Sequence, residues 1–137
     1  MQTTVEFSNV LEHPAAGRED AINHFASRLA VETDPYDLHH DLEAGVKGFT
    51  IVDPRDRPSY AKGHIPGAIS IPHRLINENT TAALNRDDLI VVYCWGPGCN
   101  AGTKAGLRFA QLGFKVKELI GGWEYWVKEG YEVETSA

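Results

Sequence analysis

The segment that most limits what this chain can fold into is the apolar run from Leu89 to Cys94. It contains consecutive β-branched residues without polar alternation, which is typical of a strand covered on both faces. Such strands belong to parallel sheets, in which a crossover helix joins one strand to the next. A helical pattern then covers Ala101–Leu112, and another strand pattern covers Val116–Ile120. This order predicts an α/β fold with a mainly parallel sheet flanked by helices.

Two further strands are expected earlier in the chain, at Phe49–Asp53 and Ala68–Ile71, because each short apolar run is stopped by a proline. Asp34 is expected to be an N-cap, with Pro35 in the first turn of the helix that follows. Further helical segments are expected at Glu19–Ala30, Tyr36–Ala44, His73–Ala83 and Trp123–Lys128.

The chain of 137 residues has the length of one domain, with an additional segment at its N-terminus. Residues 1–40 precede the strand pattern and are expected to form a helical extension packed on the same domain, which then occupies residues 41–137. Within that extension Ile22, Phe25 and Leu29 recur at helical spacing, so they predict an apolar face.

Charge and hydropathy narrow the expected partners. The net charge is −6, which disfavours nucleic acid and anionic membrane surfaces, so any bound anion needs a local site. No apolar stretch approaches the roughly 20 residues of a membrane span. Residues Met1–Phe7 have neither the basic start nor the apolar core of a signal peptide. The expected location is therefore the cytoplasm.

The apolar run ends at Cys94, and a glycine-rich loop separates this cysteine from the next helix. The carboxyl ends of parallel strands face the ligand crevice, so Cys94 is expected there. Gly96 and Gly98 leave the loop's N–H groups accessible as an anion-binding nest, and the helix dipole adds positive charge. Thiols in such surroundings have pKa values of about 3.5 to 7.5, so Cys94 is a candidate nucleophile. The alternative is an inert cysteine at a buried strand end.

Four segments carry recognisable motifs: Ile51–Arg55 with its Asp-x-Arg ending, Tyr60–Ile69 with Gly-His-Ile-Pro-Gly-Ala, Val91–Gly98, and Gly121–Trp126 with Gly-Gly-Trp-x-x-Trp. In order and spacing across residues 40–134, they resemble the motifs of the rhodanese (sulfurtransferase) family. The resemblance implies a doubly wound rhodanese-like fold. It also implies that the Cys94 thiolate accepts sulfane sulfur as a persulfide and passes it to a thiophilic acceptor.

The same resemblance implies the partners. They are a small sulfur donor (thiosulfate, polysulfide or persulfide) and a thiol or protein acceptor, with neither a metal nor an organic cofactor required. A homodimer is left open. The substrate-binding loop is expected to comprise Trp95, Gly96, Pro97, Gly98, Cys99, Asn100 and Ala101.

The loop departs from the family's common version because it is longer and carries no charged residue from Trp95 to Gly102. Many members place an Arg or Lys there to bind anionic donors, so thiosulfate:cyanide activity is expected to be weak. Arg55 and Arg74 are the cations considered able to reach the crevice instead. A cysteine-dependent phosphatase ranks lower, because such an enzyme needs an arginine in this loop.

Cys99 lies five positions after Cys94, so the two thiols are close enough along the chain to meet. Cys99 is then a candidate resolving thiol, and a thiol redox sensor or a protein-binding domain using Cys94 and Cys99 is the alternative function. The other interpretation is that Cys99 points its sulfur into the core. His64, in the Gly-His-Ile-Pro-Gly turn, is expected to be structural.

Overall fold

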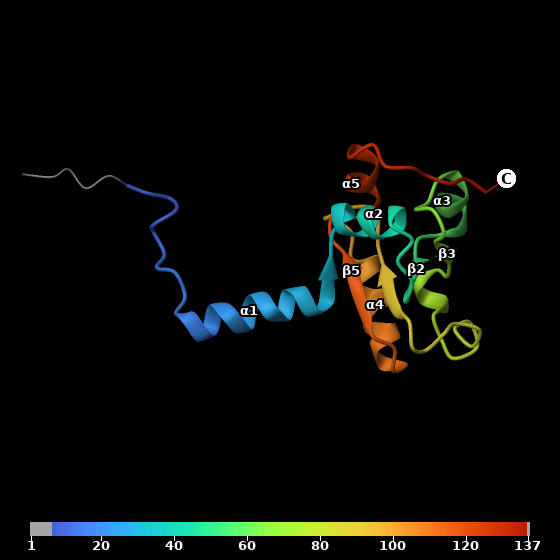
Figure 1. The fold of residues 1–137 in the computed structure, drawn as a ribbon, viewed down its shortest axis with the longest axis horizontal. Helices are drawn as coiled ribbons and strands as arrows, with labels where there is room; N and C mark the ends of the chain where they lie inside the picture. The colour runs from blue at the N-terminus through green and yellow to red at the C-terminus, as the bar shows by residue number, and fades with distance from the viewer. Residues whose placement is uncertain (1–6, 137) are drawn as a thin grey trace, which may run out of the picture.

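The computed structural model describes residues 7–136 and contains one five-stranded sheet. All neighbouring strands are parallel, in the order β1-β5-β4-β2-β3, so β4 is the central strand (Figure 1). The expected α/β fold with a parallel sheet flanked by helices is confirmed. The strands are β1 (Glu32–Thr33), β2 (Phe49–Asp53), β3 (Ile69–Ser70), β4 (Leu89–Val92) and β5 (Val116–Leu119).

The central strand is buried on both faces, as its unbroken apolar sequence predicts. Val91 packs in one core with Trp126, whereas Ile90 packs in a second core with Phe109. These two large aromatic side chains come from helices on opposite faces of the sheet. The helical elements are α1 (Arg18–Val31), α2 (Pro35–Glu43), α3 (Arg57–Lys62), the 3₁₀ helix η1 (His73–Leu75), α4 (Ala101–Gln111) and α5 (Gly122–Lys128).

The expected helix over His73–Ala83 is wrong, because only the three residues of η1 are helical. The carboxamide oxygen of Asn77 accepts the N–H groups of Asn79 and Thr80 at 2.8 and 2.9 Å, and these local bonds compete with a helix. The sequence analysis also missed α3, whose N-cap Asp56 accepts the N–H of Ser59 at 2.8 Å.

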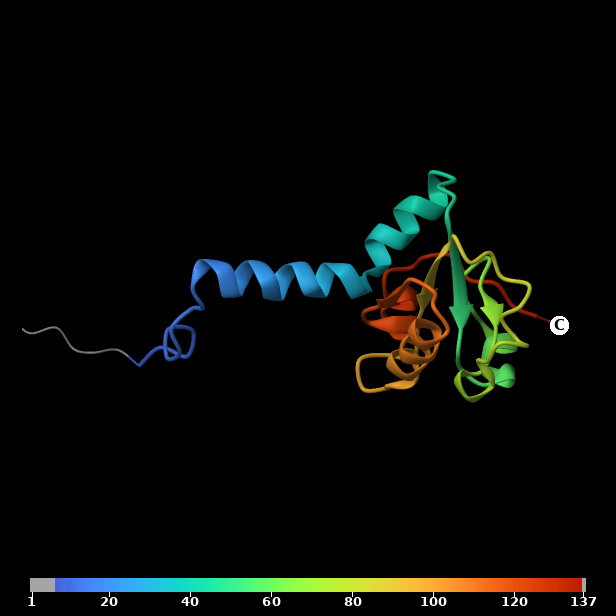
Figure 2. The ribbon, with the colours of Figure 1, turned by 90° about the horizontal axis from the view of Figure 1, so that it is seen from below.

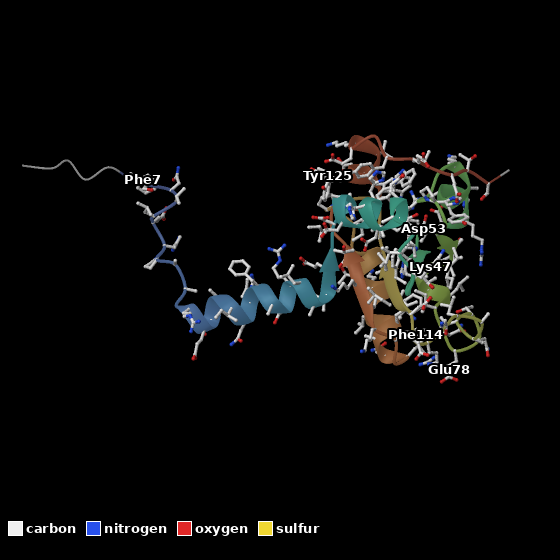
Figure 3. The ribbon with its side chains drawn as sticks, in the orientation of Figure 1. Phe7, Lys47, Asp53, Glu78, Phe114 and Tyr125 are labelled. Carbon is white, nitrogen blue, oxygen red and sulfur yellow. A yellow bond between two sulfur atoms is a disulfide. The ribbon has the colours of Figure 1, made fainter. Side chains whose placement is uncertain are left out.

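Helix α1 projects away from the domain (Figures 1 and 2). None of its residues is buried, and its apolar row of Ile22, Phe25 and Leu29 is 52%, 58% and 71% exposed. Figure 3 shows the N-terminal part of α1 away from the domain, with Phe7 beyond the far end of the helix.

This exposure differs from the expectation that the N-terminal extension packs on the domain. The C-terminal part of α1 contacts β5, and from Glu32 the segment joins the sheet, where β1 pairs with β5. The division of the chain at residue 40 stays a prediction, and residues 1–6 lie outside the described part. None of the described helices is long and apolar enough to cross a bilayer.

A buried ion pair closes the carboxyl end of β2. Arg55 donates from Nη2 to Asp53 Oδ2 at 2.7 Å and from Nε to Asp53 Oδ1 at 3.0 Å. The same Nη2 donates to the carbonyl of Gly63 at 2.6 Å. Both side chains are at most 1% exposed, so the pair depends on these bonds rather than on water.

Tyr93 ties the end of β4 to this ion pair. Its hydroxyl donates to Asp53 Oδ2 at 2.7 Å and accepts the N–H of Ile65 at 3.2 Å. Burial raises the pKa of Tyr93, with the Asp53 carboxylate as the second cause, so the phenol keeps its proton and remains a donor.

Replacing Asp53 is expected to destabilise the domain strongly. The change Asp53→Asn leaves the buried Arg55 charge uncompensated, which is expected to cost about 3–5 kcal/mol of unfolding free energy. The matched control is Glu78→Gln, which removes one carboxylate from an exposed loop and is expected to stay within about 0.5 kcal/mol. Urea unfolding followed by circular dichroism measures both, and equal midpoints would contradict the importance of the ion pair.

Candidate functional site

Cys94 lies two residues beyond the end of the central strand β4 and is 4% exposed. The ends of β2 and β3 meet at the same edge of the sheet, because all three strands run parallel. This is the edge at which open α/β sheets bind their ligands. The cysteine therefore occupies the position in the fold that its sequence context predicts.

The start of α5 holds the backbone around Cys94 in place. Trp123 donates its N–H to the carbonyl of Cys94, and Glu124 donates to the carbonyl of Trp95, both at 2.7 Å. Gly122 has φ +61°, and a Cβ at this position would overlap the Cys94 carbonyl. The Gly-Gly-Trp segment is therefore what allows α5 to approach the loop so closely.

The loop itself turns tightly before α4. Cys99 donates its N–H to the carbonyl of Gly96 at 3.0 Å, which closes a turn through Pro97 and Gly98. Among the described residues, the N–H groups of Gly96, Gly98, Asn100 and Ala101 donate to no protein acceptor. These donors, together with the α4 N-terminus, give the loop the partial positive charge that stabilises an anion.

The structure joins Cys94 and Cys99 in a disulfide, with their Cα atoms 6.2 Å apart. The expectation that the two thiols can meet is therefore confirmed, and the alternative that Cys99 turns its sulfur into the core is wrong. A free Cys94 thiolate belongs to the reduced form of this loop.

A cleft of about 310 Å³ opens in front of Cys94. Both Arg55 and Arg74, the two cations considered from the sequence, line it, as does Trp95, which is 49% exposed. The complete lining consists of Pro54, Arg55, Asp56, Pro72, His73, Arg74, Cys94, Trp95, Cys99 and Ala101.

Arg55 lies between two aromatic rings at the base of this cleft. Its guanidinium carbon is 4.6 Å from the ring centre of Trp95 and 4.9 Å from that of Trp123. Such contacts stabilise a cation out of water. Nη1 of the same guanidinium is buried and has no hydrogen-bond partner within the described chain.

A second hollow of about 450 Å³ adjoins the cleft and shares His73 and Arg74 with it. We call it the cationic hollow, because its described lining contains three cations and no carboxylate. The hollow was not expected from the sequence, although Lys104 and Arg108 stand four residues apart on the predicted helix. The lining consists of His73, Arg74, Lys104, Leu107, Arg108 and Gln111.

His64 lies outside the cleft. His64 is 4% exposed, stacks on Tyr60 at 3.7 Å and pairs its backbone with Glu134, in keeping with a structural role. In the part of the chain that the structure describes, no three His, Cys, Asp or Glu side chains gather to hold a metal ion.

Residues 34–129 match the family model described as a rhodanese-like domain, a range that begins after α1. A solved structure from Bacillus halodurans is 53% identical, with a TM-score of 0.84, and the alignment covers 85% of each chain. A second solved structure, from Lactobacillus plantarum, is 28% identical with a TM-score of 0.72 over 85% of this chain and 98% of that one.

Curated relatives give a similar result. Thiosulfate sulfurtransferase GlpE of Pseudomonas paraeruginosa is 38% identical over 90 residues, which cover 65% of this chain and 78% of the relative. An HTH-type transcriptional regulator of Mycobacterium tuberculosis is also 38% identical, over 64% of this chain. A tRNA sulfurtransferase of Pyrobaculum aerophilum is 30% identical over 82% of this chain.

This chain spans only 38% of that regulator and 22% of that tRNA sulfurtransferase, so the match concerns one domain of each. The family model, in contrast, covers well over half of this chain. The chain belongs to the rhodanese-like domain family.

Proposed function

We propose that this protein is a sulfurtransferase in which Cys94 carries sulfur as a persulfide. The observation that carries the proposal is the placement of Cys94 in the wall of a cleft, in a loop with several N–H groups that have no acceptor among the described residues. Such a loop stabilises a thiolate and equally stabilises the terminal sulfur anion of a persulfide. Relatives named thiosulfate sulfurtransferase and tRNA sulfurtransferase support the same assignment.

The first step is attack of the Cys94 thiolate on the sulfane sulfur of a donor. A sulfur–sulfur bond forms to Cys94, the donor's own bond to that sulfur breaks, and its electron pair leaves with the remainder of the donor. In the second step a thiophilic acceptor attacks the outer sulfur and restores the Cys94 thiolate. This two-step covalent transfer predicts ping-pong kinetics.

A cysteine-dependent phosphatase is the weaker assignment for this loop. Transfer of a phosphoryl group needs positively charged donors around its equatorial oxygens. No arginine stands between Cys94 and Lys104, and Arg55 is already engaged by Asp53.

The change Cys94→Ser is expected to abolish sulfur loading, because a serine hydroxyl stays protonated in this loop. Wild-type protein, reduced beforehand, is expected to gain one sulfur atom on incubation with a polysulfide or a persulfide donor. Intact mass and peptide mapping locate the added sulfur. Loading that survives in the Cys94→Ser variant would overturn the assignment of the nucleophile.

Thiol redox sensing is a second candidate function, which the Cys94–Cys99 disulfide specifically favours. The two functions share one step. The Cys99 thiolate attacks the inner sulfur of the Cys94 persulfide, the Cys94–Cys99 bond forms, and hydrosulfide leaves with the electron pair. The persulfide is thereby reduced to hydrosulfide, and an external thiol must then reduce the disulfide before the next cycle.

The change Cys99→Ser is expected to lengthen the lifetime of the Cys94 persulfide by about tenfold or more, because it removes an attacking thiol held within the same loop. Hydrosulfide release from loaded protein, followed over time without added thiol, measures the effect. Equal release rates in the variant and the wild type would show that Cys99 does not resolve the persulfide.

We further propose that α1 pairs two copies of this chain. A helix of 14 residues that buries none of them is marginal in water. Its apolar row of Ile22, Phe25 and Leu29 is the same in every copy, so two rows bury each other in a symmetric contact.

Replacing the apolar row by glutamate, in Ile22→Glu/Phe25→Glu/Leu29→Glu, is expected to convert a dimer into a monomer, since three charges cannot be buried against their copies. Light scattering after size exclusion gives the molar mass. The control variant Glu19→Gln/Asp20→Gln alters the charge of α1 without touching the row. A wild-type mass of one chain would contradict the pairing.

A further inference from the structure

The cationic hollow is the feature of the molecule that the transfer chemistry does not explain. Lys104 and Arg108 stand one helical turn apart on α4, and Arg74 faces them from the segment that follows β3. Like charges at this helical spacing repel each other. The chain holds them together although its acidic residues outnumber its basic ones by 19 to 13.

Three observations indicate that the hollow receives a ligand. First, none of the three cations forms an ion pair with a carboxylate of the described chain. Second, Nδ1 of His73, on the wall that the hollow shares with the cleft, is buried without a hydrogen-bond partner among the described residues. Third, the hollow opens beside the cleft of Cys94 rather than on a remote face.

The pKa of His73 is affected by all three cations of the hollow. Burial lowers the pKa of His73 below its ordinary value, and the charges of Lys104, Arg74 and Arg108 lower it further. The imidazole therefore stays neutral at neutral pH. The lasting positive charge of the hollow comes from the lysine and the two arginines, and arginine matches carboxylate and phosphate geometry in particular.

Size adds a constraint on the ligand. The cleft and the hollow measure about 310 and 450 Å³, and His73 and Arg74 belong to both. Together they have the dimensions of a site for a molecule larger than an inorganic sulfur anion. The loop around Cys94 has no cation, so the charged part of such a molecule is bound in the hollow and its sulfur in the cleft.

We propose that the cationic hollow binds the oxyanion groups, carboxylate or phosphate, of an organic persulfide whose sulfane sulfur enters the cleft and reaches Cys94. This inference rests on the proposed sulfur transfer and names its donor class. The Cys94 thiolate attacks the outer sulfur of R–S–SH, the new sulfur–sulfur bond forms, and R–S⁻ leaves with the electron pair. Cys94 ends as Cys94–S–SH, and no further oxidant or reductant is consumed.

The test measures the initial rate of sulfur loading on the reduced full chain with three donors. Glutathione persulfide carries carboxylates, coenzyme A persulfide carries phosphates, and 2-mercaptoethanol persulfide has an uncharged body. The anionic donors are expected to have a KM about tenfold lower than the uncharged donor, at similar kcat, because charge-assisted contacts hold R and not the reacting sulfur. The donor with the lower KM identifies carboxylate or phosphate as the preferred group.

The variant Lys104→Gln/Arg108→Gln is expected to lose this preference, so that the ratio of the KM values falls close to one. The matched control Lys47→Gln/Lys115→Gln removes the same charge at the amino ends of β2 and β5 and is expected to keep the preference. The separate variant Arg74→Gln removes the third cation of the hollow and is expected to weaken the same preference. All five positions are exposed, and circular dichroism checks the fold of each variant.

If the KM ratio is unchanged in both hollow variants while all donors load Cys94, the hollow does not bind the donor. The proposed sulfurtransferase activity is then unaffected. Failure of every donor to load wild-type Cys94 would overturn both. Raised salt supplies a second readout, since it is expected to raise the KM of the anionic donors and leave that of the uncharged donor in place.

Discussion

The buried pair of Asp53 and Arg55 is the interaction on which the site depends. The carboxylate ends β2, and Tyr93, which donates to it, follows the last residue of β4. The guanidinium then bonds to the carbonyl of Gly63 and stacks between Trp95 and Trp123. One ion pair thus fixes two strand ends, the α3–β3 connection, the reactive loop and the start of α5. Because removal of one partner leaves the other charge buried, these five segments are stabilised together.

This coupling supports the proposed transfer, because the loop carries no cation of its own. A loop that must hold an anion on backbone N–H groups needs those groups fixed before the anion arrives. Its carbonyls at Cys94 and Trp95 accept the N–H groups of α5, and these two bonds fix the loop backbone against that helix. Gly122 makes that contact possible, since any side chain there would overlap the Cys94 carbonyl.

Much of this arrangement follows from the sequence. The run from Leu89 to Cys94 predicts the central strand and the position of the cysteine, and the four motif segments predict the fold. Elements governed by local hydrogen bonds were missed: the Asn77 side chain replaces a helix after Leu75, and Asp56 begins one where none was expected. The exposure of α1 was missed because periodicity identifies an apolar face but not what covers it. The cationic hollow needs α4 and η1 to be placed side by side, which only the tertiary structure supplies.

The same geometry separates the residues around Cys94 from the cations on η1 and α4. In the proposed transfer, the nucleophile and the N–H donors that stabilise the anion lie in one loop, where any added charge would also alter the pKa of the thiol. The cations on η1 and α4 lie outside this loop, and in the same proposal they bind the part of the donor that does not react. Contacts to the unreacting part of a substrate change which molecule binds, while contacts at the reacting atoms set the rate. A rhodanese-like loop without an arginine therefore need not be a weakened version of the common one, since recognition of the donor can move to the neighbouring helix while the cysteine and its N–H groups stay unchanged.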